Sequence, residues 1–189
     1  HAESGYDGCY IRGSQQVTVN SSGAIQIGAT IPDPVVTSVD KNAFIESTDS
    51  NVVVTYVTSL TMNGAGTKGD SRIYNLSSSG TVTVNGAGPL IMNGGYGSDC
   101  SARIYCTDLG NLEVGTTTAP STITLNGGEG LNGEASMHTN GNVTVVAVGD
   151  IALNGGSGSS AYAGIRTNGS STKILTVDCG GDISITPGT

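Results

Sequence analysis

The sequence contains four cysteines, and their spacing limits which disulfides can form. Cys100 and Cys106 are six residues apart and flank one short apolar segment, so we expect a disulfide between them. Cys9 and Cys179 lie near opposite ends of the chain, and we expect them to be free or to link two copies of the protein. Because disulfides persist in oxidising compartments, this cysteine usage favours an extracellular protein.

Acidic side chains suggest a second kind of site, in which carboxylate oxygens would hold calcium. The stretch "GGYGSDCSA" (94–102) resembles the calcium-binding nonapeptide G-G-x-G-x-D-x-U-x, except that Ser101 occupies the position of an apolar residue. Asp70, Asp99 and Glu134 fall at similar points before three short apolar segments. Such hard oxygen ligands at one corner could bind Ca²⁺. Solvated acidic turns are the interpretation that we favour, and we expect no cofactor.

Hydrolysis of a sugar chain would require two carboxylates that face one glycosidic bond. Along two of the three types of repeated segment described below, the central outward positions include a single carboxylate, Glu113. The remaining type, which is the second segment of each repeat, has a chemically varied outward column. Such a column suits contact with a partner better than catalysis. We therefore expect no enzymatic activity. The residues of this column are Arg12, Glu46, Tyr74, Tyr105, His138 and Arg166.

The charge balance and the first residue narrow the choice of partners and location. The net charge is −8, and the sequence has no basic stripe of the kind that nucleic-acid binding needs. It also has no apolar run near the ~20 residues that cross a bilayer, so we expect no membrane span. The chain begins with His1 rather than Met, which predicts that a signal peptide has been removed and that the protein is secreted or displayed on a cell surface.

A repeat of about 30 residues organises the whole chain. The motif Leu-Asn-Gly-Gly occurs at 125–128 and 153–156, with variants at 62–65 and 92–95. In each repeat we mark the residue that directly follows an apolar-x-apolar pair such as Ile-x-Ile. Successive marked residues are separated by 35, 30, 33, 28 and 32 residues. A period that drifts by a few residues is typical of a solenoid, whose corners accept insertions. The markers are Gly28, Asn63, Asn93, Asn126, Asn154 and Thr186.

Each repeat contains three short segments in which apolar and polar residues alternate, as in half-buried strands. The sequence therefore predicts an all-β, parallel β-solenoid (β-helix) with three strands per rung and about six rungs of ~30 residues. We expect one domain over residues 1–189, with 1–7 as a short N-terminal lead-in. The Asn-Gly pairs would form one corner of each rung, where the asparagine amides can stack into a hydrogen-bonded ladder. The second strands would centre on Ile11, Ile45, Ile73, Ile104, Met137 and Ile165.

Phrases such as "GNVTVVAVGDIALNGGSG" and "LTVDCGGDISITPG" place a strand, a Gly-Asp turn and another strand in series. This style of repeat resembles the parallel β-helix of filamentous-haemagglutinin-type adhesins and secreted β-solenoids. The resemblance covers nearly the whole chain. It implies right-handed winding and a role in surface attachment or extracellular structure.

A β-solenoid without visible caps would expose unpaired strand edges and an open apolar core at both ends. The leading expectation is a secreted structural subunit that binds copies of itself head-to-tail and forms an extracellular filament. Its first rung would continue the spacing of the last rung of the preceding copy. We expect the contact to include Cys9, Ile11, Val17, Val19, Ile174, Val177, Ile183 and Ile185.

The alternative is a surface-binding module, either an adhesin or a protein that binds ice or glycans. Ice binding would use a regular column of threonines on one outer face of the solenoid. The third segments offer such a column, but Val53 and Glu113 interrupt it. Its threonines are Thr18, Thr83, Thr144 and Thr176.

Overall fold

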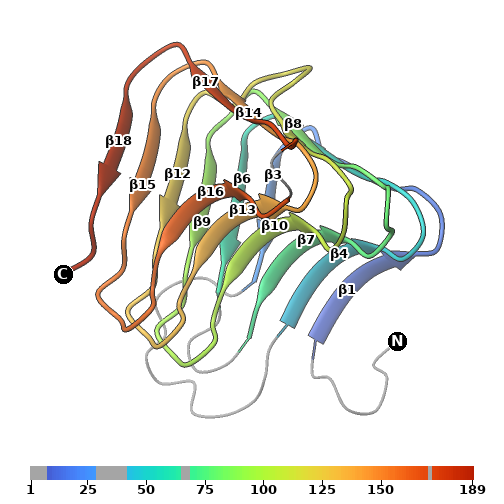
Figure 1. Cartoon of the computed structure of the whole chain (residues 1–189). Helices are drawn as coiled ribbons and strands as arrows, with labels where there is room; N and C mark the ends of the chain where they lie inside the picture. The colour runs from blue at the N-terminus through green and yellow to red at the C-terminus, as the bar shows by residue number, and fades with distance from the viewer. Residues whose placement is uncertain (1–7, 29–41, 65–68, 170–171) are drawn as a thin grey trace.

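The computed structural model describes residues 8–28, 42–64, 69–169 and 172–189 (Figure 1). These residues form three six-stranded parallel sheets, and no helix occurs among them. The strands of each sheet stack side by side, and the first and last rungs lie at opposite ends of the stack (Figure 1). The chain is an all-β, parallel β-solenoid, as the repeat predicted.

The chain visits the three sheets in turn, and one strand from each makes a rung. Sheet A contains β1 (Gly8–Gly13), β4 (Asn42–Ser47), β7 (Ser71–Asn75), β10 (Ala102–Cys106), β13 (Ala135–Thr139) and β16 (Ala163–Thr167). Sheet B contains β2 (Val17–Asn20), β5 (Val52–Tyr56), β8 (Val82–Gly86), β11 (Leu112–Val114), β14 (Val143–Ala147) and β17 (Leu175–Cys179). Sheet C contains β3 (Ala24–Ile27), β6 (Ser59–Asn63), β9 (Leu90–Asn93), β12 (Ile123–Asn126), β15 (Ile151–Asn154) and β18 (Ile183–Thr186). The first rung is therefore β1–β3, and the last rung is β16–β18.

Strand register places like residues above one another, and this builds the core. In sheet A the expected column is continuous from Ile11 to Ile165. In sheet C, Leu90 pairs with Ile123 and Met92 pairs with Leu125. The inward side chains of the inner rungs, such as Leu60, Leu90 and Ile123, are completely buried. Each inner rung thus buries its apolar face against its two neighbours, which one strand could not do alone.

The corner between sheets C and A carries the predicted asparagine ladder. The side-chain amide of Asn93 donates to Asn63 (2.8 Å), that of Asn126 donates to Asn93 (2.7 Å), and that of Asn154 donates to Asn126 (2.8 Å). Six residues beyond each of the last three ladder positions, one residue adopts a left-handed backbone conformation. These residues are Asp99 (φ 58°), Asn132 (φ 57°) and Ser160 (φ 59°). The same turn is therefore repeated in three successive rungs.

Candidate interaction surfaces: the outer face of sheet A and the last rung

The outer face of sheet A carries the chemically varied column that the sequence indicated. All four arginines of the chain, Arg12, Arg72, Arg103 and Arg166, lie on strands of this sheet. Because the isoleucines at the strand centres point into the core, the residues on either side of them point outward. The central outward columns of sheets B and C hold small or uncharged side chains, with Glu113 as their one charged member. The charged and aromatic side chains are therefore concentrated on one of the three faces.

Carboxylates on the same face neutralise three of these arginines. Arg12 pairs with Glu46, which lies in the next rung and is only 1% exposed. Arg72 pairs with Asp70. Arg103 pairs with Glu134 and also lies 3.9 Å from Asp70. The contacts Arg12–Glu46, Arg103–Glu134 and Arg103–Asp70 link neighbouring rungs, because their members are about one repeat apart in the sequence. Arg72 and Asp70 are only two residues apart, so their pair lies within one rung.

Aromatic rings form a stack along the same face. Tyr74 and Tyr105 stack with ring centroids 5.1 Å apart, and Tyr105 and His138 stack at 5.2 Å. Phe44 meets Tyr74 edge-on at 5.7 Å, and Arg72 lies over the Phe44 ring. Both faces of the Tyr105 ring are covered by its neighbours, so this ring presents its edge to a ligand.

Burial sets the protonation of this stack. Desolvation lowers the pKa of His138 to about 4, and the positive charge of Arg166 acts in the same direction. Burial likewise raises the pKa of the Tyr105 hydroxyl. At neutral pH the imidazole and the phenol are therefore both uncharged, which allows close stacking among the arginines. The hydroxyl of Ser136 also lies 3.2 Å from the His138 Nδ1.

The outer face of sheet A is thus a network whose members contact one another. The Tyr74 hydroxyl donates to Glu46, the Tyr162 hydroxyl donates to Glu134, and Arg166 donates to the Tyr162 hydroxyl (2.6 Å). The sequence column predicted contact with a partner, but most of these side chains are engaged within the molecule. The role that the geometry supports is to hold the rungs of sheet A together.

The three calcium candidates do not converge on one site. Asp70 and Glu134 contact Arg103, whose positive charge opposes cation binding at these carboxylates. Asp99 accepts a hydrogen bond from the side chain of Asn132 (2.8 Å). Among the described residues there is no group of three or more His, Cys, Asp or Glu side chains that could hold a metal ion. The calcium interpretation is therefore not supported, and the acidic residues act as partners for arginine and asparagine.

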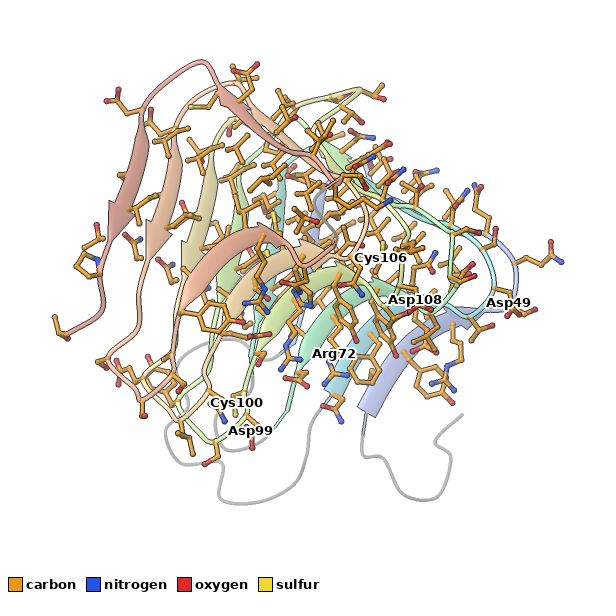
Figure 2. All side chains as sticks on the ribbon, viewed as in Figure 1. Asp49, Arg72, Asp99, Cys100, Cys106 and Asp108 are labelled. Atoms are coloured by element: carbon orange, nitrogen blue, oxygen red, sulfur yellow. The ribbon has the colours of Figure 1, made fainter. Side chains whose placement is uncertain are left out.

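The expected Cys100–Cys106 disulfide is wrong, since all four cysteines are free. Cys100 precedes β10 and Cys106 ends it, and Figure 2 shows the two well apart. An extended strand advances ~3.3 Å per residue, so six residues separate the two Cα atoms by about 20 Å. A disulfide needs about 7 Å or less. Both thiols are buried, and the Cys106 thiol donates to the carbonyl of Asn111 (3.1 Å).

The register also rules out a Cys9–Cys179 disulfide between copies stacked in phase. Cys9 belongs to the column of sheet A that contains Ala163 in the last rung. Cys179 pairs with Ala147 at the end of sheet B, at a different corner of the rung. A copy that continued the rungs would therefore place Cys9 above Ala163, far from Cys179.

The last rung is the main open apolar surface among the described residues. Its inward side chains are exposed, with Leu175 at 42%, Ile183 at 51% and Ile185 at 74%, and the neighbouring Ile174 is exposed as well. Val177 lies in the same rung and is half-buried. Each strand of this rung is the terminal strand of its sheet, so no described strand lies beside one of its backbone edges.

The first rung differs from the last rung, because its exposed apolar side chains lie mainly on β1. Cys9 is exposed and Ile11 is 51% exposed. Val17 and Ile27 are buried, and Val19 is half-buried. The residues expected in an end-to-end contact therefore lie at the two ends, as predicted, but only part of the first-rung set is accessible.

The threonine column of sheet B has the interruptions that the sequence predicted. Register places Val53 between Thr18 and Thr83, and it places Glu113 between Thr83 and Thr144. A charged side chain in the centre of the face breaks the regular array of hydroxyl and methyl groups. The regular threonine array that ice binding would use is therefore incomplete on this face.

Comparison of the chain with protein-family models, with curated proteins and with solved structures gives no match. The resemblance in repeat style to filamentous-haemagglutinin-type solenoids therefore stays a prediction. In the part of the chain that the structure describes, no helix has the length and apolar character needed to cross a membrane.

Proposed function

We propose that the protein is a structural solenoid subunit that associates end to end with copies of itself. The observation that carries this proposal is the exposure of the last rung. Inward positions of sheet C are completely buried at Ile123 and Leu125 in the fourth rung, whereas the equivalent Ile183 and Ile185 are exposed. A surface built as the inside of a protein is most stable when another rung covers it.

The first rung of another copy has the matching chemistry. It would bring Ile11 over Ile165, Val17 over Leu175 and Ile25 over Ile183, and these pairs continue the columns seen inside the molecule. Three strand edges would gain backbone hydrogen bonds, each worth a net ~0.5–1.5 kcal/mol. Full burial of each large aliphatic side chain would add ~1.5–3 kcal/mol. Such a head-to-tail contact is heterologous and extends into a filament unless its rotation closes a ring.

Association can be measured by sedimentation velocity over a wide range of protein concentration, with negative-stain imaging of the same samples. We expect concentration-dependent oligomers in the unmodified protein and monomers for Ile185→Asp. Leu109→Asp is the matched control, because Leu109 is also exposed but lies at the side of an inner rung, between β10 and β11. This control should associate like the unmodified protein.

The shape of the oligomer tests the head-to-tail mode separately. Because Val17 and Ile27 are already buried, they would add little newly buried area to a head-to-tail contact. Filaments would support the head-to-tail mode. A closed dimer would show instead that two last rungs meet and would overturn it. A protein that stays monomeric at high concentration would refute end-to-end association altogether.

The proposed setting is extracellular, and it rests on the polar, lysine-poor composition. The cysteines no longer support it, because all four are free. Secretion can be tested by expressing the encoding gene in its native host and locating the protein with an antibody. Recovery of the protein only from the cell interior would contradict this setting.

A further inference from the structure

A hollow of about 240 Å³ opens at the corner between sheets C and A. Its side chains come from Asn93, Tyr96, Asn126 and Glu129, and three glycines contribute only backbone. The hollow lies where the loops after β9 and β12 stack on each other. The amide of Asp99 in the first loop donates to the carbonyl of Leu131 in the second (2.9 Å), so the two loops hold their relative positions.

The ladder fixes the two asparagine amides that line the hollow. Each amide donates one N–H to the preceding rung and accepts one hydrogen bond from the next rung. A primary amide has two N–H donors and an oxygen with two lone pairs, so each side chain keeps one donor and one acceptor. Neither of these two side-chain amides forms a further hydrogen bond with the described residues. Their spare groups are therefore oriented before any ligand arrives, which lowers the entropic cost of binding.

Tyr96 is an exposed aromatic side chain, unlike the stacked rings of sheet A. Its side chain is 42% exposed, and none of the ring contacts among the described residues involves it. The stacked rings of Tyr74 and Tyr105, by contrast, cover each other's faces. An aromatic ring with an accessible face can pack against the C–H groups of a flat apolar surface.

Glu129 determines which ligands are compatible with the hollow. Its carboxylate is exposed beside the asparagines, and none of the described residues that line the hollow is cationic. Phosphates, sulfates and other anions are therefore disfavoured. A single carboxylate is also too few ligands for Ca²⁺. The groups that do match are hydroxyls, because a hydroxyl can donate to the carboxylate and both donate to and accept from an amide.

We propose that this corner hollow binds one pyranose residue of a neutral glycan. The sugar would place a C–H face against Tyr96, and its hydroxyls would bond to Asn93, Asn126 and Glu129. The volume supports a single residue, since pockets for larger ligands span roughly 300–1,000 Å³. The site does not depend on end-to-end association, because it lies at the side of inner rungs.

The test is an NMR titration of the ¹⁵N-labelled full chain with the methyl glycosides of glucose, galactose, mannose and N-acetylglucosamine, at millimolar concentrations. We expect at least one glycoside to cause saturable shifts at the backbone amides of Gly94, Gly127 and Gly128. Tyr96→Ala should weaken this binding by roughly tenfold or more. Leu131→Ala is the matched control, because Leu131 is exposed on the loop that carries Glu129 but does not line the hollow.

Glu129→Ala provides a second variant that should also weaken binding, so the test survives if Tyr96→Ala fails to fold. Loss of binding in either folded variant, together with retention in Leu131→Ala, would support the site. The proposal is overturned if none of the glycosides gives saturable shifts. It is also overturned if the shifts map to another face or persist in both lining variants.

Discussion

Leu125 and Ile185 occupy the same inward column of sheet C, two rungs apart, yet Leu125 is completely buried and Ile185 is 74% exposed. Their side chains are nearly equal in size and apolar character. The difference comes from their neighbours, since Leu125 has a rung on each side, whereas the described strands place a rung on only one side of Ile185. In a solenoid, the contribution of a residue to stability therefore depends on its rung as much as on its type.

The largest contrast is expected from truncating these two residues. Leu125→Ala should lower the free energy of unfolding by about 2–5 kcal/mol, because it leaves a cavity in the packed core. Ile185→Ala should change it by about 0.5 kcal/mol or less in dilute, monomeric protein. Urea unfolding followed by circular dichroism measures both values. Equal losses would mean that the last rung is as well packed as the inner ones.

The loss of stability at low pH should show how well the last rung covers His138 in the fifth rung. His138 lies in the fifth rung beside Arg166 of the last rung, and its pKa in the folded protein is about 4. In the unfolded chain it is ~6.5. The stabilisation from burying the neutral imidazole is therefore complete above pH ~6.5 and is lost as the pH falls toward ~4, at most roughly 3 kcal/mol.

His138→Phe is the matched variant, since it keeps a planar ring in the stack but cannot be protonated. As the pH falls, the free energy of unfolding should decrease less for the phenylalanine variant than for the unmodified protein. Urea unfolding at about pH 7 and about pH 4.5 would measure this difference. A difference independent of pH would contradict the burial of His138. Arg166→Ala should also raise the pKa of His138, because it removes both cover and positive charge, and NMR titration of the imidazole would measure this shift.

Replacing glycine by alanine should also destabilise an inner rung more than the last rung, by a smaller amount. A Cβ on Gly86, in the third rung, would overlap the buried ring of Tyr56 in the rung beneath it. Gly86→Ala should therefore cost about 1–3 kcal/mol through overpacking. Gly164, in the last rung, would place its Cβ at an ordinary contact distance of 3.5 Å from Tyr162. Gly164→Ala should be nearly neutral in the same unfolding experiment, and a similar loss at both sites would refute the contrast.

The asparagine ladder offers the smallest and most local comparison. Among the described residues, Asn126 takes part in two ladder bonds, whereas Asn154 takes part in one, which it donates to Asn126. At a net ~0.5–1.5 kcal/mol per bond, Asn126→Ala should cost about twice as much as Asn154→Ala. Thermal unfolding of the two variants would measure the ratio. Indistinguishable losses would indicate that ladder bonds contribute independently of their position along the stack.

The sequence predicted the fold and the register because both follow from local patterns. Alternating apolar residues near Ile73 and Ile104, together with Asn-Gly corners, define where each strand lies and which side chains point inward. The marker at Asn126 was sufficient to align its rung with those of Asn93 and Asn154. This alignment is the pairing that the structure contains.

The contacts within the outer face of sheet A were harder to predict. Arg12 and Glu46 were recognised as neighbours in one column, and their opposite charges were the available signal for the ion pair. Asp70 and Glu134 lie just before their strands, and the sequence alone does not show that their carboxylates turn toward Arg103. The hollow beside Tyr96 was missed because loop conformation, rather than periodicity, creates it.

The disulfide prediction was wrong for a geometric reason. A separation of six residues between Cys100 and Cys106 is short along the chain, but most of it is taken up by the extended strand β10. A bridge across it would have required a turn in the place of that strand. Spacing in a sequence therefore indicates proximity only when the conformation between the two residues is known.

The corner turn has a further consequence for how such a chain changes length. Asn93 and Asn126 begin loops of equal length with left-handed residues at equivalent positions, and their amides occupy successive steps of one ladder. Removing residues 94–126 would join Asn93 directly to Gly127 and recreate the same corner. Duplicating that segment would add one rung in the same way. The gene can thus be shortened or extended by one whole module at this corner, because the junction that results is a turn that the structure already contains.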